Sequence, residues 1–257
     1  MEGIVQTSPR VVVPSFLARM VGVFYLVLMI SGFDMFVVFR RLVVRGDAAV
    51  TAANILAHQA TFMAGFAAAA LGVAAYLVVT VLFYRLFEPV NRTLSLCAAF
   101  FSLTGCVVQA FALVFHLAPL LVLNLPGADH AYLSAFQPEQ LQALALVVLN
   151  CYAQAYNISL VFFGFYLLQI GYLTARSSFL PRWLGVIVAL FGVGWLAFLY
   201  PPLARALSWY IVLSSLGEGL LVVWLAVKGV DDERWREQAV GKLSEQATRE
   251  TDEPRMR

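Results

Sequence analysis

Three ionisable side chains, Asp34, His116 and Glu218, lie inside long apolar stretches of the chain. Placing such a group at the centre of a membrane helix costs at least about 2.5–3.5 kcal/mol, so it is by default a candidate for function. A carboxyl group at that depth could bind a proton or a cation. Glu218 is the sharpest candidate, because glycines on both sides of it let another backbone or a ligand approach closely.

Uncharged polar residues accompany these three at helical spacing. Gln109 precedes His116 by seven residues and Ser214 precedes Glu218 by four, so each pair shares a helix face. We expect one inward-facing polar cavity lined by eight residues, namely Glu218, His116, Gln109, Asn150, Gln154, Asn157, Asp34 and Ser214.

A packing role is the alternative for every one of these residues. Interhelical hydrogen bonds of Asn, Gln, Ser and His often only hold helices together, at about 0.6 kcal/mol each. Asp34 could instead reach Arg40, Arg41 or interfacial water. A protonated Glu218 bonded to a carbonyl group would be inert.

The composition is that of a membrane protein. Of the 257 residues, 61% are hydrophobic and 12% are charged, whereas soluble domains have about 45–50% and about 25%. These values exclude a soluble enzyme, a disulfide-stapled secreted module and a disordered chain. A net charge of +2 gives no reason to expect a nucleic acid partner.

A membrane-crossing helix needs about 20 apolar residues, and the chain has six such stretches, at about 16–39, 62–84, 94–125, 141–175, 183–204 and 207–227. None alternates apolar and polar residues as a β-barrel strand does. We therefore expect an all-α integral membrane bundle of six transmembrane helices. The domains would be an N-terminal segment (1–15), the bundle (16–230) and a charged tail (231–257) that continues the sixth helix.

The basic residues predict the orientation. Positive charge favours the cytoplasmic side, and an even number of spans puts both termini on one side. With both termini in the cytoplasm, nine Lys and Arg near span ends lie inside and four lie outside. We therefore expect cytoplasmic termini and a multi-pass protein of the bacterial plasma membrane.

Two connections predict helices of their own. Asp47 is placed to cap a helix over 48–57. Ser134 stands three residues before Gln137 and suits a capping box, with Pro138 in the first turn.

Several short strings resemble, in their order and spacing, a family of bacterial membrane proteins described as domain of unknown function 4386. These strings are Arg45–Ala49, Ala53–Leu56, Tyr84–Leu86, Pro89–Arg92, Leu133–Phe136, Pro138–Leu144, Leu160–Gly164, Phe179–Pro181, Leu184–Val186, Gly217–Glu218, Trp224–Leu225 and Lys228–Gly229. The resemblance covers about Val13 to Val230. It implies a six-span bacterial membrane protein and brings with it no activity, cofactor or site residue.

Familiar catalytic and metal-binding patterns are missing from the sequence. A zinc site needs three or four converging His, Cys or carboxylate ligands, but His58, His116 and His130 lie on an interfacial segment, a span and a loop. There is no glycine-rich phosphate loop and no GxSxG elbow. The three cysteines all lie within spans, where we expect them to act as small hydrophobic residues and not as a redox pair. We expect no catalytic site, no metal and no cofactor.

Three hypotheses of function follow. The one we favour is a small transporter or membrane-embedded binding protein, in which Glu218 binds a proton, a cation or a small molecule. The second is a structural or regulatory membrane subunit whose tail meets a cytoplasmic partner. The third is a membrane-embedded enzyme. In all three the lipid bilayer is the main partner.

The orientation can be tested by cysteine labelling of intact cells. Sites just after Arg182 and in the tail should react only from the cytoplasmic side, and a site near Asp129 only from outside. Labelling of the Arg182 and Asp129 sites from the same side would contradict six spans.

Overall fold

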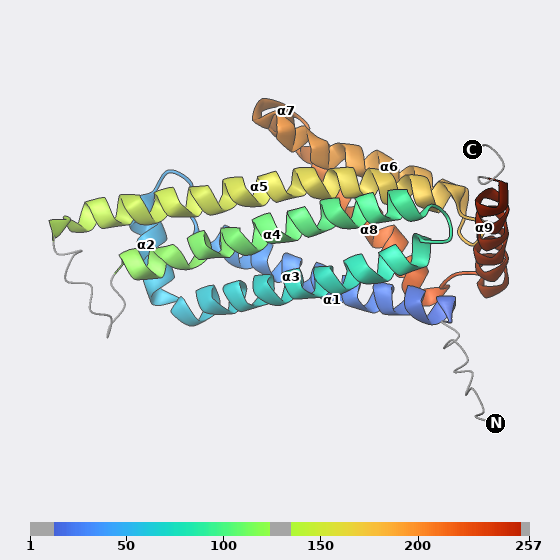
Figure 1. Ribbon diagram of the computed structural model, residues 1–257. Coiled ribbons are helices and arrows are strands. Elements are labelled where there is room, and N and C mark those ends of the chain that lie inside the picture. The colour runs from blue at the N-terminus through green and yellow to red at the C-terminus, as the bar shows by residue number, and fades with distance from the viewer. Residues whose placement is uncertain (1–12, 124–134, 253–257) are drawn as a thin grey trace, which may run out of the picture.

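The computed structural model describes residues 13–123 and 135–252, without the side chains of 30, 31, 33–39, 208, 211–213, 215–217, 243 and 245–252. All regular structure in these ranges is helical (Figure 1). The elements are α1 (Pro14–Leu42), α2 (Ala48–Ala57), α3 (Gln59–Phe87), α4 (Arg92–Val122), α5 (Pro138–Arg176), α6 (Arg182–Leu196), the 3-10 turn η2 (Ala197–Leu199), α7 (Pro201–Ala206), α8 (Ser208–Val227) and α9 (Asp232–Asp252).

Four helices in the described part of the chain are long and apolar enough to cross a membrane. They are α3, α4, α5 and the continuous α6–η2 segment Arg182–Leu199. Shorter apolar segments lie in α1, at Pro14–Met29, and in α8, at Glu218–Val227. These helices indicate a membrane protein.

The long helices run side by side, with α2 at one end of the bundle and α9 lying across the other (Figure 1). Neighbouring pairs are α1 with α3, α3 with α4, α4 with α5, α5 with α6, α6 with α8, and α8 with α1. Six helices therefore form a closed ring, which α8 completes between α6 and α1.

Aromatic side chains fill the middle of this ring. Tyr76 of α3 lies 4.4 Å from Phe163 of α5, ring centroid to centroid, and 5.8 Å from Tyr25 of α1. Tyr25 meets Phe83 edge-on at 6.5 Å. All four are buried, so α1, α3 and α5 are joined by one aromatic core.

Glycines let α5 and α6 approach closely. A Cβ atom added to Gly171 would lie 2.5 Å from the backbone nitrogen of Ala189 and 2.7 Å from the carbonyl oxygen of Gly185. Neither backbone atom can move away without shifting α6. The contact therefore depends on the absence of a side chain at position 171.

The fifth apolar stretch, expected at 183–204, is not one continuous helix. Helix α6 ends at Leu196, η2 follows, and Tyr200 has extended backbone angles before Pro201 begins α7. The physical reason is the Pro201–Pro202 pair, because a proline disfavours helical backbone in the residue before it. Helix α6 is therefore shorter than the α5 helix that it packs against.

The charged tail does not continue the sixth helix as the sequence predicted. Gly229 has a positive φ of 68° and lets the chain turn after α8. Helix α9 then crosses the end of the bundle (Figure 1). Its Trp235 donates to the carbonyl oxygen of Leu86 at 2.9 Å, and its Asp232 accepts from the Ser15 backbone at 2.7 Å.

The two predicted helix starts have different outcomes. Asp47 caps α2 and accepts from the Val50 backbone at 2.9 Å, as expected. The N-cap of α5 is Gln137, whose backbone donates to Gln140 Oε1 at 2.9 Å, with Pro138 next. Ser134, the cap that the sequence predicted, lies outside the described residues.

Replacing Gly171 with alanine should destabilise the protein by about 1–3 kcal/mol, the usual cost of overpacking. The added methyl group meets backbone atoms of α6. Thermal unfolding in detergent measures the effect. Gly241→Ala in α9 is the matched control, since a Cβ there meets nothing within 4 Å. Equal melting temperatures for both variants would contradict the close contact of α5 and α6.

Candidate ligand site at Glu218

Glu218 accepts hydrogen bonds from two other helices. Its Oε2 accepts from the Tyr25 hydroxyl of α1 at 2.8 Å, and its Oε1 accepts from the indole N–H of Trp195 in α6. Its side chain is half-buried. One carboxyl group in α8 therefore connects the three helices at the point where the ring closes.

Further tyrosines extend from Tyr25 into the bundle. The ring of Tyr76 lies 5.8 Å from that of Tyr25, the residue that donates to Glu218. Tyr166 lies 6.1 Å from Tyr76 and is only 1% exposed. Its hydroxyl has no hydrogen-bond partner within the described part of the chain. The site therefore combines one acid, four aromatic side chains and the buried Tyr166 hydroxyl, which is free to bond.

Trp195 and Tyr25, the two hydrogen-bond donors to Glu218, differ in whether they can also accept a hydrogen bond. An indole N–H can only donate, whereas a tyrosine hydroxyl both donates and accepts. In the ionised form, Glu218 accepts from both groups. In the neutral form, a proton on Oε2 can be donated to the Tyr25 oxygen, and the Tyr25 hydroxyl hydrogen then turns to another acceptor. Protonation of Glu218 can thus reverse the direction of the hydrogen bond with Tyr25.

His116 lies in a different part of the bundle. Its ring is fully buried and stacks on Phe62 at 4.4 Å, its Nε2 lies 3.3 Å from the Phe62 carbonyl oxygen, and Tyr152 lies at 5.2 Å. Phe62 and Tyr76 are 14 residues apart on α3, which is about 21 Å along a helix. His116 and Glu218 therefore do not share one cavity in this structure.

The polar residues of α5 lie beyond the end of α6. Asn150 and Gln154 are exposed and Asn157 is half-buried. Asn157 precedes Gly164 by seven residues and shares its helix face, and Gly164 contacts Leu196, the last residue of α6. The residues were expected to face inward, but in this structure Asn150 and Gln154 are exposed and only Asn157 is half-buried.

Ser214 and Gln109, the other predicted residues whose side chains are described, form no hydrogen bond with Glu218 in that part of the chain. Ser214 is buried, and its hydroxyl donates to the Tyr210 carbonyl of its own helix at 2.9 Å. Gln109 is half-buried. The side chain of Asp34 lies outside those described. Among the described residues, no three His, Cys, Asp or Glu side chains are grouped so that they could hold a metal ion.

Sequence reasoning missed both partners of Glu218. Trp195 did carry a signal, because it lies well inside an apolar stretch whereas Trp183 and Trp209 lie near span ends. A buried indole N–H usually finds an acceptor, and Glu218 was an acceptor in need of a donor. Tyr25 carried no such signal, since it is one of several aromatic residues in its stretch.

Comparison with known proteins identifies the family. The model of the family described as Domain of unknown function (DUF4386) matches residues 20–229. The chain belongs to this family. Both ends of the Glu218–Tyr25 bond and Trp195 fall within the matched region of this DUF4386 protein.

A second comparison finds an uncharacterised protein of Archaeoglobus fulgidus, 27% identical over 84 residues. The match covers 32% of the DUF4386 chain and 50% of the archaeal protein, so the chain spans about half the length of this relative. No solved structure gives a significant match.

The Glu218 contacts predict a specific energetic coupling. Trp195→Phe and Glu218→Leu should each lower the free energy of unfolding by about 1–3 kcal/mol, because a hydrogen bond to an acid is lost. In the double variant, the free energy of unfolding should fall by less than the sum of the two single losses, since both changes remove the same hydrogen bond. Denaturation in detergent measures all three.

Tyr172→Phe in α5, where the tyrosine side chain is exposed, is the control and should change little. Strict additivity of Trp195→Phe and Glu218→Leu would mean that the indole and the carboxyl group do not interact.

Proposed function

We propose that the chain crosses the membrane six times, with α1 and α8 joining the four longer apolar helices, and that both termini lie in the cytoplasm. The closed ring of six helices supports this number of spans. The charges support the orientation, because the α9 end of the bundle carries Arg85, Arg92, Arg176, Arg182 and Lys228. The opposite end carries Arg40, Arg41 and Arg45.

We further propose that the protein is a membrane-embedded binding protein or small transporter, and not an enzyme, and that Glu218 binds its ligand, a proton or a cation. The single observation behind this proposal is the pair of donors from α1 and α6 on the Glu218 carboxyl group. A proton or a cation that binds there removes or redirects the contact with Tyr25. Occupancy of the site therefore changes how α1 is held against α8.

The second candidate function is a structural or regulatory subunit that binds a cytoplasmic partner through α9. The observation in its favour is the position of α9, which crosses the bundle end and exposes Val240 at 65%. In that case the Glu218 contacts only fasten helices together. The two functions differ in whether proton or cation concentration affects the protein.

Thermal stability across pH and added cations distinguishes the two functions. A species that binds only the folded protein stabilises it in proportion to its concentration and affinity. We expect the melting temperature of the unaltered protein to depend on pH, Na⁺, K⁺ or tetramethylammonium. The Glu218→Gln variant should fold and lose that dependence, because glutamine keeps a carbonyl acceptor for Trp195 but cannot gain a proton or bind a cation as a carboxylate.

Glu218→Leu is the matched variant that removes all hydrogen bonding at this position. If Glu218→Gln matches the unaltered protein at every pH and salt while Glu218→Leu is destabilised, the carboxyl group has only a packing role. That result would contradict a proton or cation site.

A further inference from the structure

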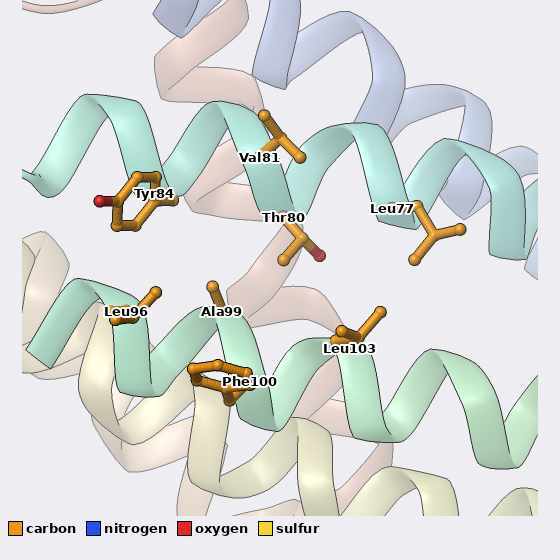
Figure 2. A pocket seen from close by; sticks show the side chains of 8 residues that line it. All are labelled: Leu77, Thr80, Val81, Tyr84, Leu96, Ala99, Phe100 and Leu103. Carbon is orange, nitrogen blue, oxygen red and sulfur yellow. The ribbon is translucent and has the colours of Figure 1, made fainter.

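An apolar groove of about 320 Å³ lies on the outer surface of the bundle between α3 and α4. Figure 2 shows side chains of both helices along it. Eight residues line the groove, namely Leu77, Thr80, Val81, Tyr84, Leu96, Ala99, Phe100 and Leu103. It belongs to neither the Glu218 site nor the His116 contacts.

The one hydroxyl group deep in the wall of the groove is already satisfied. Thr80 donates to the Tyr76 carbonyl oxygen at 2.8 Å, and its oxygen lies 2.6 Å from the Ser102 hydroxyl. The threonine therefore offers the groove no polar group in need of a partner. The surface that remains suits an alkyl chain.

The groove ends at a cationic cluster at the α9 end of the bundle. Tyr84 is its last residue on α3, and the Tyr84 hydroxyl donates to Glu88 at 3.3 Å. The same Glu88 pairs with Arg85 at 3.9 Å and with Arg92 at 3.5 Å. Two arginines thus share one carboxylate, which leaves a net positive charge.

Both guanidinium groups can turn to another anion. The arginine side chains are 66% and 71% exposed, and ion pairs as exposed as these contribute little to stability. Arginine binds phosphate well, because its planar N–H groups match two phosphate oxygens. The apolar groove lies next to the two arginines, just as the acyl chain of a phospholipid lies next to its phosphate group.

We propose that this surface binds one anionic phospholipid, with an acyl chain in the α3–α4 groove and the phosphate at Arg85 and Arg92. The length of the groove runs from Leu77 to Tyr84 along α3, which is about 10 Å. It therefore holds the part of the acyl chain nearest the headgroup. The binding does not depend on the function of Glu218.

Native mass spectrometry of the full chain in detergent tests the proposal, with phosphatidylglycerol and a diacylglycerol of the same chains as probes. The unaltered protein should bind one phosphatidylglycerol, at least tenfold more tightly than diacylglycerol, because only the former carries a phosphate. Ala99→Phe, which fills the groove, and the double variant Arg85→Gln/Arg92→Gln should each weaken phosphatidylglycerol binding about tenfold.

Matched controls come from the same helix and the same end of the bundle. Ala110→Phe changes an exposed alanine of α4 outside the groove, and Arg182→Gln removes an exposed arginine at the start of α6. Both should bind phosphatidylglycerol as the unaltered protein does. Unchanged binding in Ala99→Phe or in the double arginine variant would overturn the proposal. So would a dimer that Ala99→Phe dissociates, because a second copy would then occupy the groove.

Discussion

The carboxyl group of Glu218 has to be hydrogen-bonded, because it lies among apolar helices where an unpaired polar group is costly. Tyr25 and Trp195 meet this need from α1 and α6. Helices in lipid gain no hydrophobic driving force from packing together, so close packing and hydrogen bonds must hold them. The side chain that is the best candidate for binding a ligand is therefore also one of the contacts that close the ring at α8, together with the close approach of Gly22 in α1 to Ala226 in α8.

Two other contacts hold the remaining parts of the ring in place. Gly171 and Gly185 let the backbones of α5 and α6 meet, which fixes the position of Trp195 along α5. At the end of the bundle, α9 is hydrogen-bonded to Ser15 at the start of α1 and to Leu86 at the end of α3. Glu218 therefore contacts two helices, α1 and α6, that are each held in place by a separate contact.

On the outer surface, too, polar groups that lie between apolar helices are hydrogen-bonded. Between α3 and α4 the hydroxyl groups of Thr80 and Ser102 satisfy each other, so the groove beside them is apolar. At the helix ends Glu88 is outnumbered by Arg85 and Arg92. The polar groups beside the groove are hydrogen-bonded to each other, whereas at the helix ends the basic residues outnumber the acidic one. This arrangement matches the division of a bilayer into a hydrocarbon layer and headgroup layers.

The sequence predicted the helices well, because a run of about 20 apolar residues has few other structures available in a membrane. Helices cover most of each predicted stretch, although the one at 183–204 is interrupted at Tyr200, and Asp47 caps α2. The turns were harder to predict. Pro201 and Gly229 were visible, but whether they end a helix depends on what the following segment packs against. That Glu218 binds a ligand stays a prediction, and its partners Tyr25 and Trp195 were not identified from the sequence, because they are distant from it in the chain and belong to no motif.

Infrared difference spectroscopy between acid and alkaline pH is the most direct test of the central claim, that Glu218 is a protonatable group bonded to Tyr25 and Trp195. The protein would be compared with Glu218→Gln and Trp195→Phe in lipid nanodiscs. We predict a protonated-carboxyl C=O band that is absent in Glu218→Gln and shifted in frequency in Trp195→Phe, because the indole N–H bonds the carboxyl oxygen. Identical difference spectra for the unaltered protein and Glu218→Gln would contradict the account.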